Sequence, residues 1–234
     1  MPVIDVRGVT HAYGDGQARR IVLRDVSVTL SEQRIGVIGA NGSGKSTFVR
    51  LLNGLVLPAE GTVSVHGLDT RKQGREVRRR VGFCFTDPDA QIVMPTVAED
   101  VAFGLRRRGL GKAEVAARVR ATLETYGLAD HADHPAHLLS GGQKQLLALS
   151  SVLVTDPDVL VLDEPTTLLD LRNAAVVQQV VSGLPHQVIL VTHHLDLIED
   201  FERVLVFDET RVVYDGRPDD AVAYYRDLMR TSAP

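Results

Sequence analysis

A glycine-rich loop between an expected strand and an expected helix constrains this chain more than any other feature of its sequence. Residues 39–47 read GANGSGKST and match the pattern G-x-x-x-x-G-K-[ST]. A short apolar run, 34–38, precedes the loop, and the residues from Lys45 to about Asn53 favour a helix. Glycines let such a loop turn tightly and aim successive N–H groups at phosphate oxygens, beside the positive end of the helix. The loop therefore predicts nucleotide binding.

Two side chains at the end of this loop have defined tasks in phosphoryl-transfer chemistry. Lys45 would reach the β- and γ-phosphates, and the hydroxyl of Ser46 would ligate Mg²⁺. The pattern therefore predicts a nucleotide as the ligand and Mg²⁺ as its cofactor. The residues that we expect to contact the nucleotide from this loop are Asn41, Gly42, Ser43, Gly44, Lys45, Ser46 and Thr47.

Two further apolar runs end in residues that suit catalysis. Residues 159–162 lead into Asp163 and Glu164, and residues 188–191 lead into Thr192 and His193. Parallel strands present their carboxyl ends at one edge of a sheet, where ligands bind. There Asp163 would hold Mg²⁺, Glu164 would orient the attacking water, and His193 would bind the γ-phosphate. Any one of these residues could lie in a solvated loop. Together with the glycine-rich loop after residues 34–38, however, there are three such strand ends, and this favours a catalytic site.

The remaining pattern predicts an α/β protein with a helical insertion. Residues 3–9 and 21–30 alternate apolar with polar side chains, as antiparallel strands with one wet face do. Helical spacing dominates from about 96 to 127. We expect one domain over 1–234, with 1–85 and 155–234 as its core and about 86–154 as a coupling region and helical subdomain. Other expected elements are strands at 61–65 and 81–85, a polar loop at 128–137, a helix from near Ser140, a hairpin at 203–214 and a helix at 218–229.

Composition narrows the possible partners. The formal net charge of −4 argues against a general nucleic-acid binder. The single cysteine, Cys84, excludes an internal disulfide and suits a reducing cytoplasm. No apolar run approaches the roughly 20 residues that a membrane span needs. If the protein works at a membrane, another chain must hold it there.

A second glycine motif opens the helix near residue 140. Residues 139–143 read LSGGQ, in which Ser140 is a natural N-cap and the two glycines expose backbone N–H groups at a positive helix end. Taken alone, this sequence is a common way to begin a helix. With the other motifs it identifies a family, since the chain resembles the nucleotide-binding domains of ATP-binding cassette (ABC) transporters over nearly its whole length.

That resemblance implies a fold and a mechanism. The fold is a RecA-like P-loop NTPase core with a parallel sheet, an antiparallel β subdomain and a helical subdomain that carries the signature motif. In the mechanism two such domains, expected to be copies of this chain, pair head to tail, with each ATP between one P-loop and the other domain's signature. Residues implied to act in trans are Ser140, Gly141, Gly142 and Gln143. Asp170 fits the D-loop, and Tyr13 stands where an aromatic stacks on adenine, although a loop tyrosine can also simply pack locally.

One stretch indicates the branch of the family. Residues 81–104 look like the coupling region of energy-coupling-factor (ECF) importers, which take up vitamins and transition-metal ions. With residues 168–173, the chain is most similar to the ATPase of biotin-type systems. This implies a transmembrane coupling subunit, a membrane-embedded substrate-binding subunit and a place on the cytoplasmic face of the membrane. The alternatives are an importer of cobalt, nickel or another vitamin, a soluble ABC ATPase, or a nucleotide-dependent clamp with negligible turnover.

Two features depart from simple expectation. Thr86 occupies the Q-loop position, where most relatives carry a glutamine that reaches Mg²⁺ and the γ-phosphate, and threonine is too short to do so. His131, His134 and His137 lie three apart in the polar loop. A metal site is conceivable there, but histidines on a surface loop are more often simply solvated.

Overall fold

The structure is a computed structural model that describes residues 3–14, 16–106 and 108–231. The ends of the expected domain and its residues 15 and 107 lie outside the described residues. The chain forms two compact units, of which unit 1 comprises Met1–Val81, Asp158–Asp163 and His186–Pro234. Unit 2 comprises Gly82–Pro157 and Glu164–Pro185. The segment after Asp163 groups with unit 2 because its helix packs against the signature helix, a long-range contact that periodicity does not reveal.

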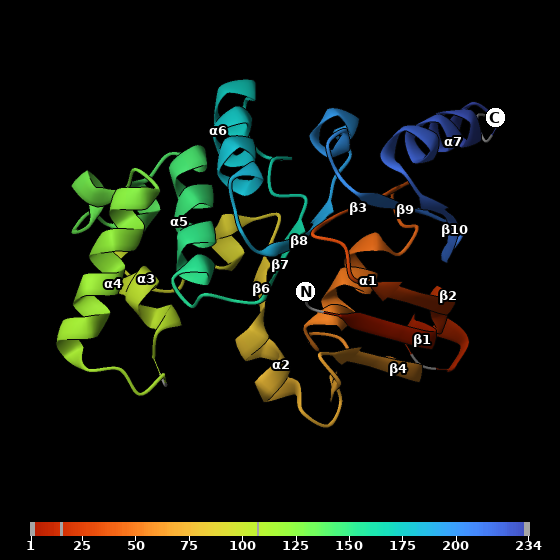
Figure 1. Ribbon diagram of the computed structural model, residues 1–234, viewed down its shortest axis with the longest axis horizontal. Helices are drawn as coiled ribbons and strands as arrows, with labels where there is room; N and C mark the ends of the chain where they lie inside the picture. Colours follow the sequence, from red (N-terminus) through yellow and green to blue (C-terminus); the bar gives the residue numbers. More distant parts are fainter. Residues whose placement is uncertain (1–2, 15, 107, 232–234) are drawn as a thin grey trace. The chain divides into compact units, whose positions relative to one another are not determined.

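An antiparallel sheet forms the first part of unit 1 (Figure 1). Its order is β2-β1-β4-β5. Alternate residues of β1, among them Ile4 and Val6, are buried on one face and pair with Leu30 and Val28 of β2. The predicted antiparallel pairing is confirmed, and β1 runs further than expected, to Tyr13. The strands are β1 (Ile4–Tyr13), β2 (Arg20–Leu30), β4 (Glu60–Val65) and β5 (Leu68–Asp69), with a 3₁₀ turn, η1 (Gly16–Ala18).

Parallel strands form the second sheet of unit 1, in the order β9-β3-β8-β7, with β10 antiparallel at its edge. Their runs of valine, isoleucine and leucine are buried throughout, as expected for strands covered on both faces. The strands are β3 (Arg34–Gly39), β7 (Val159–Asp163), β8 (Gln187–Val191), β9 (Arg203–Asp208) and β10 (Arg211–Gly216). This arrangement confirms the expected parallel core and the C-terminal hairpin.

Several helices complete unit 1. The helix after the glycine-rich loop begins at Lys45 as predicted, and the C-terminal helix continues two residues past its expected end at 229. A helix after β5 was not predicted, because its basic sequence has a single buried apolar side chain, Val77, and hence no apolar periodicity. These helices are α1 (Lys45–Leu52), α2 (Gly74–Arg80), η5 (Leu195–Ile198) and α7 (Pro218–Thr231).

Unit 2 is mainly helical. The chain enters it through β6 (Val81–Cys84). Thr96 and Ser140 each begin a helix with a capping box, in which the side chain of the third helical residue returns to the N-cap backbone. The expected polar loop, 128–137, contains two short 3₁₀ turns. The elements are η2 (Pro88–Ala90), α3 (Val97–Gly104), α4 (Lys112–Thr125), η3 (Ala129–His131), η4 (Ala136–Leu138), α5 (Gly141–Leu153) and α6 (Leu171–Ser182).

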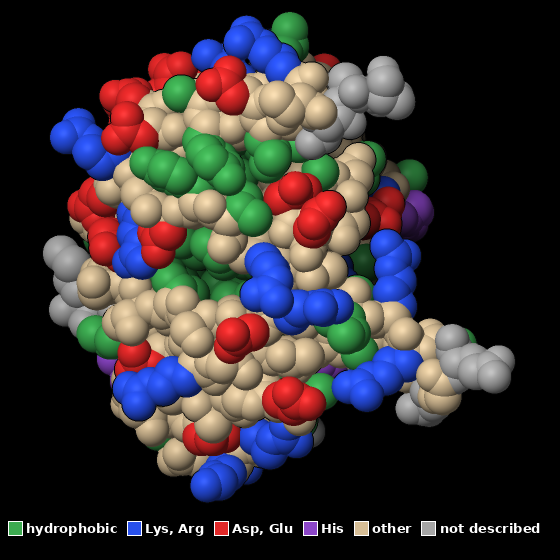
Figure 2. Space-filling model, turned by 90° about the vertical axis from the view of Figure 1, so that its right-hand side faces the viewer, with side chains coloured by type: hydrophobic (Ala, Val, Ile, Leu, Met, Phe, Trp, Pro, Cys, Tyr) green, Lys and Arg blue, Asp and Glu red, His purple; other side chains and the backbone are tan. Residues whose placement is uncertain are grey.

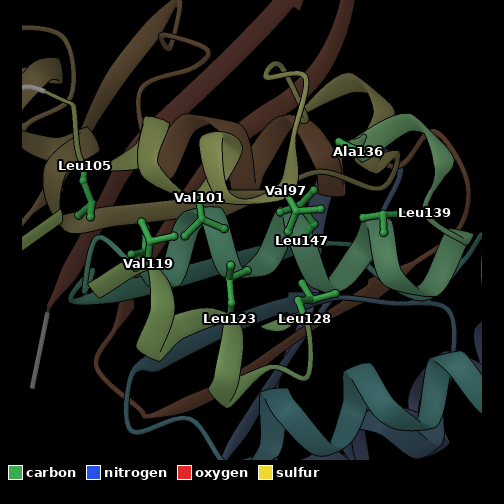
Figure 3. Close-up of a cluster of buried hydrophobic side chains, with 10 residues drawn as sticks. Val97, Val101, Leu105, Val119, Leu123, Leu128, Ala136, Leu139 and Leu147 are labelled. Atoms are coloured by element: carbon green, nitrogen blue, oxygen red, sulfur yellow. The ribbon is translucent and has the colours of Figure 1, made fainter. Parts of the chain in front are cut away.

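The helices of unit 2 share a core of their own, shown in Figure 3. Val97 and Val101 of α3 pack with Val119 and Leu123 of α4 and with Leu147 of α5. These side chains recur at the i, i+4 spacing that places them on one face of each helix. The apolar series predicted from the sequence thus supplies the core of the unit that carries the signature motif.

Figure 2 shows the side of the molecule on which β10, β1 and β2 lie in Figure 1. Apolar side chains gather there in a patch, and basic and acidic side chains are interspersed around it. Tyr214 of β10 stacks on Tyr224 of α7, with ring centroids 5.1 Å apart, and holds the last helix on the hairpin. Among the described residues, no helix has the length and apolar character that crossing a bilayer requires.

Candidate functional site

The loop at residues 39–44 follows β3 and closes on the first residue of α1. Gly39 and Gly44 have φ angles of +145° and +108°, in the left-handed region that favours glycine. A Cβ atom at Gly39 would collide with the carbonyl oxygen of Phe207, and one at Gly44 with that of Val22. Lys45 is 5% exposed, and its Nζ donates to the carbonyl oxygens of Gly39 and Ala40 at 2.8 and 2.9 Å. The lysine ammonium is thus held at the centre of the loop.

Ser46 and Asp163 come together as the sequence predicts. The Oγ atom of Ser46 donates to Oδ1 of Asp163 at 2.9 Å, although the residues are 117 positions apart. Asp163 is 1% exposed. A hydroxyl and a carboxylate at this separation are two hard oxygen ligands, the donor type that Mg²⁺ prefers.

A residue that the sequence analysis missed completes this pair. Arg50 of α1 donates from Nη2 to Oδ2 of Asp163 at 3.3 Å, so Ser46 and Arg50 engage different oxygens of one carboxylate. Arg50 lies four residues after Ser46, on the same face of α1. That spacing was the available signal, and it could have suggested a second partner for the buried acid.

The glycine-rich loop also has a feature that suits a bound phosphate. Ser43 is 4% exposed, and its hydroxyl oxygen has no hydrogen-bond partner among the described residues. A buried hydroxyl normally has a partner, and phosphate oxygens would supply one. Asn41 and Gly42 are exposed at the rim of the loop, whereas Thr47 is buried in the first turn of α1.

Strand register brings the other predicted groups of unit 1 to the same edge. Asp163 pairs with Val191 in the parallel β7–β8 ladder, and Val191 also pairs with Val37 of β3. His193 follows two residues after Val191 and is exposed. Tyr13 ends β1, where the residue is 45% exposed and its hydroxyl lies 3.4 Å from Oγ1 of Thr47. Tyr13 is therefore beside the phosphate loop and leaves much of its ring accessible.

Glu164, directly after β7, has an unusual backbone. Its φ angle is +54°, a left-handed conformation that costs a non-glycine residue of order 1 kcal/mol or more. Thr167 stabilises the turn, because its Oγ1 donates to Oε2 of Glu164 at 3.1 Å and its N–H donates to the Glu164 carbonyl at 3.3 Å. Such strain at a carboxylate-bearing residue is typical of a functional position.

The signature motif begins α5 in unit 2. Ser140 is the N-cap, as predicted, and its Oγ accepts from the N–H of Gln143 at 3.3 Å, while Oε1 of Gln143 accepts from the N–H of Ser140 at 2.9 Å. Gly141 is exposed and Gly142 is buried. The helix thus presents its N-terminus at Gly141 without a side chain in front of it.

Asp170 caps the neighbouring helix, α6. Its Oδ1 accepts from the N–H of Asn173 at 2.8 Å, and its Oδ2 accepts from the side-chain amide of Asn173 at 3.0 Å. Asn173 also packs against Gly142, where a Cβ atom would lie 2.5 Å from Asn173 Cγ. Asn173 therefore connects the predicted D-loop acid with the signature helix, which the sequence alone did not suggest.

The Q-loop position and the histidine loop also lie in unit 2. Thr86 is half-buried after β6. Among the described residues, no group of three or more histidine, cysteine or acidic side chains is placed to hold a metal ion. The structure therefore gives no support to the alternative of a metal site at His131, His134 and His137. The first two instead hydrogen-bond to each other, with their Nδ1 atoms 2.9 Å apart.

The predicted residues thus form two groups. Unit 1 brings together Tyr13, the phosphate loop, Asp163 and His193. Unit 2 holds the other set, namely Thr86, Ser140, Gly141, Gly142, Gln143, Glu164 and Asp170. The first group has what binding a nucleotide and a divalent cation requires, and the second holds a strained carboxylate and an accessible helix N-terminus.

Comparison with known proteins agrees with this geometry. A family model described as ABC transporter matches residues 23–167, which run from before the phosphate loop to Thr167. The chain belongs to the ABC transporter ATPase family. As a member of this ABC family it is an ATPase, and its hydrolysis of ATP powers transport.

Relatives within the ABC family cover most of the chain. The biotin transport ATP-binding protein BioM of Rhizobium etli is 50% identical over 209 residues, or 89% of this chain and 93% of the relative. The energy-coupling factor transporter ATP-binding protein EcfA1 of Symbiobacterium thermophilum is 44% identical, covering 95% of this chain and 82% of the relative. The solved structure of cbiO1 from Clostridium perfringens, part of the ABC transporter complex cbiONQ, has a TM-score of 0.82 at 31% identity and covers 97% and 93%.

Proposed function

We propose that this chain is the ATPase subunit of an ECF-type importer, with biotin as the transported substrate. The observation that carries the proposal is the Ser46–Asp163 pair at 2.9 Å beside the buried Lys45, at the carboxyl edge of a parallel sheet. Such a constellation supplies cation ligands and a phosphate-binding charge at one place, as phosphoryl transfer requires.

The phosphate loop would bind the triphosphate of ATP. Backbone N–H groups of residues 41–47 would point at its oxygens, and the Ser43 hydroxyl would gain the partner that the described residues do not give it. Lys45 would exchange its bonds to two loop carbonyls for the β- and γ-phosphates. The accessible ring of Tyr13 would stack on the adenine.

Ser46 and Asp163 would hold Mg²⁺, with Asp163 acting through the ion's water shell. When bound, the ion neutralises charge on the β- and γ-phosphate oxygens. The contribution of the chain is to fix the two ligands before the ion arrives. Arg50 assists, because its guanidinium holds the second oxygen of Asp163 and leaves the first facing Ser46.

Glu164 and His193 would act on the attacking water and the γ-phosphate. Glu164 would accept a hydrogen bond from the water, whose oxygen forms a bond to the γ-phosphorus while the bond from that phosphorus to the β,γ-bridging oxygen breaks. The products are ADP and inorganic phosphate, and the proton of the water leaves through Glu164 to the phosphate. Thr167 would keep the carboxylate in its strained turn, and His193 would hydrogen-bond the γ-phosphate.

A second copy of the chain would complete each site. The exposed N-terminus of α5 at Ser140 and Gly141 is an anion-binding helix end. In a head-to-tail pair Ser140, Gly141, Gly142 and Gln143 would close over the γ-phosphate bound by the other chain. Asp170, held by Asn173 next to that helix, would contact the partner at the same interface.

Membrane subunits would couple this cycle to uptake. Apolar side chains of α3 and α4 line a groove of about 540 Å³ in unit 2, and Phe103 of α3 is 43% exposed. Such a surface fits a helix of a transmembrane coupling subunit, which would keep the ATPase at the cytoplasmic face of the membrane. The biotin assignment rests on the relative named for biotin transport, and a separate membrane-embedded subunit would bind the substrate itself.

The experiment uses the Glu164→Gln variant. It should bind ATP with Mg²⁺ and pair stably, while hydrolysis falls by at least about a hundredfold, because an amide cannot accept the proton of the water. Glu124→Gln, an exposed site on α4, is the matched control and should hydrolyse ATP like the parent. Normal turnover by Glu164→Gln would refute the catalytic assignment. Purification from detergent-solubilised membranes should also recover integral membrane subunits and biotin-binding activity. Recovery of a cobalt- or nickel-binding subunit instead would show that the transported substrate is that metal ion and not biotin.

A further inference from the structure

A chain of hydrogen bonds links the histidine loop to the signature motif. Nδ1 of His131 lies 2.9 Å from Nδ1 of His134, and Nε2 of His131 lies 2.9 Å from the side-chain Nε2 of Gln143. The other end of that amide, Oε1 of Gln143, accepts from the N–H of Ser140 at 2.9 Å. One glutamine therefore touches both an imidazole and the N-cap of α5.

The backbone fixes the orientation of the Gln143 amide. The N–H of Ser140 can only donate, so the atom of Gln143 that faces it must be the oxygen. The atom that faces His131 is then the amide nitrogen, which can only donate. Nε2 of His131 must accept this bond and therefore carries no proton.

This requirement determines the protonation of both rings. With Nε2 bare, a neutral His131 carries its proton on Nδ1 and donates it to Nδ1 of His134. A second proton on His131 would place an N–H against the amide N–H₂ of Gln143. The amide could then flip, which would set its N–H₂ against the N–H of Ser140, or move away, and either change breaks the capping box.

Within the described residues, no carboxylate hydrogen-bonds or pairs with either ring to compensate for a charged His131. The charged and titratable side chains of the surrounding elements are Asp130, Asp133, His134 and His137 on the loop, Glu99 on α3, Lys112, Glu114, Arg118, Arg120 and Glu124 on α4, Lys144 on α5, and Asp170 and Arg172 at the start of α6. Of these, Lys144 pairs with Asp89 at 2.7 Å and Arg118 with Glu114 at 3.0 Å. The N-terminus of α5 itself disfavours a nearby positive charge.

We propose that His131 is a positioning residue for the signature motif. Its neutral imidazole fixes Gln143 in the capping box, and its protonation releases the N-terminus of α5 and weakens ATP-dependent pairing. The inference rests on the proposed function, since it assigns the signature helix to the pairing step. Imidazoles change charge between about pH 5 and 8, so pairing should strengthen from acid to neutral pH.

Pairing is measured by light scattering with ATP and Mg²⁺ in the Glu164→Gln background, at about pH 6 and about pH 8. The parent should pair roughly three- to tenfold more weakly at the lower pH, as the loss of one hydrogen bond implies. His131→Gln places a non-titrating acceptor near the position of Nε2 and should pair equally well at both values. His131→Leu removes the acceptor and should pair weakly at both.

His137→Gln is the matched control, because His137 is an exposed histidine of the same loop, and it should keep the pH dependence of the parent. An equal pH dependence in the parent and His131→Gln overturns the inference, as does stronger pairing of the parent at acid pH. Pairing that requires added zinc and disappears with a chelator overturns it in favour of a metal site.

A second readout separates this inference from the proposed function. In the unpaired protein without nucleotide, the NMR signals of the Gln143 side-chain amide and the Ser140 N–H should shift together between about pH 8 and 6. The shift should be absent in His131→Gln. Failure of the parent to pair at any pH refutes the proposed function. The inference is refuted if the two NMR signals shift with pH in His131→Gln as they do in the parent.

Discussion

The side-chain amide of Gln91 donates to the backbone carbonyl of Ala148 at 2.7 Å. Its oxygen accepts from the N–H of Phe85 at 3.1 Å, so both ends of the amide are bound within unit 2. The bond to Ala148 ties the turn after β6 to the signature helix α5. Gln91 is the glutamine nearest to Thr86 in sequence, and its bonds leave it unable to replace a Q-loop glutamine without breaking this link.

The first prediction follows for Thr86. We expect Thr86→Gln to leave ATP hydrolysis intact or to raise it by up to about tenfold, since a longer side chain can reach the cation and the γ-phosphate. Steady-state phosphate release measures the effect. Gln91→Ala should instead lower stability by about 1 kcal/mol, through the loss of two hydrogen bonds. Collapse of turnover in Thr86→Gln would show that threonine has a dedicated role.

The two glycines of the signature motif should differ in their tolerance of a methyl group. A Cβ atom at Gly142 would lie 2.5 Å from Cγ and 2.9 Å from Cβ of Asn173, so the asparagine and α6 must shift. We expect Gly142→Ala to lower the free energy of unfolding by about 1–3 kcal/mol. Chemical denaturation of the purified variant measures this.

Gly141→Ala provides the matched comparison. A Cβ atom there meets only Cδ2 of Leu169, at an ordinary 3.9 Å, so its unfolding free energy should stay within about 0.5 kcal/mol of the parent. The double variant Gly142→Ala with Asn173→Ala should recover part of the lost stability, because the two shortest contacts, with Oδ1 and Cγ of Asn173, are removed and only the contact with Cβ at 2.9 Å remains. Equal stability of both single variants would contradict the close packing of Asn173.

Local signals predicted much of this structure. Several elements can be recognised from a few neighbouring residues, and the structure contains them as expected. They are the glycine loop, the apolar strands that lead to Asp163 and His193, and the helix capped by Ser140. Short segments of sequence likewise predict the parallel strands, through continuous apolar runs, and the helical core, through apolar residues at i, i+4 spacing. The antiparallel sheet followed from alternation alone.

Other features depend on contacts between distant segments. Arg50 meets Asp163 across 113 residues, and His131 meets Gln143 across the turn that begins α5. The grouping of α6 with α5 depends on the fit of Asn173 against Gly142. The sequence gives no periodic signal for contacts of this kind. Arg50, for example, cannot be distinguished from any other basic residue on a helix until its partner is known.

The third prediction concerns Arg50. Arg50→Met removes a donor from the buried Asp163, so its carboxylate is less well oriented toward Ser46. The Mg²⁺ concentration for half-maximal nucleotide binding should rise about tenfold, as is typical when a partner of a metal ligand is lost. Nucleotide binding without Mg²⁺ should be unchanged. Arg120→Met, exposed on α4, should leave both quantities as in the parent, and an unchanged Mg²⁺ requirement in Arg50→Met would refute the role of Arg50.

The last prediction concerns the pH dependence of stability through Arg203. Its guanidinium donates to both oxygens of Glu32 at 3.1 Å and, through two nitrogens, to the oxygens of Asp215 at 2.6 and 2.7 Å. Burial raises the pKa of Glu32, but backbone N–H groups and Arg203 lower it by more, so the net pKa lies below its ordinary value. The stability from Glu32 is therefore present above about pH 4 and is lost as the pH falls through the lowered pKa. Hydrogen bonds to Asp215 raise the pKa of Arg203, so its own contribution persists throughout this range.

Arg203→Lys should lower the free energy of unfolding by about 1–3 kcal/mol near pH 7, because one ammonium cannot serve two carboxylates with paired bonds. The difference from the parent should shrink as the pH falls through the lowered pKa of Glu32, toward about pH 3, because a protonated Glu32 no longer attracts either cation. Denaturant unfolding at both pH values measures it. Arg230→Lys is the control, since its pair with Asp227 at 3.3 Å is largely exposed and should contribute little at either pH. A deficit in Arg203→Lys that is the same at both pH values would mean that packing of the guanidinium, and not its charged partners, stabilises this end of the β9–β10 hairpin.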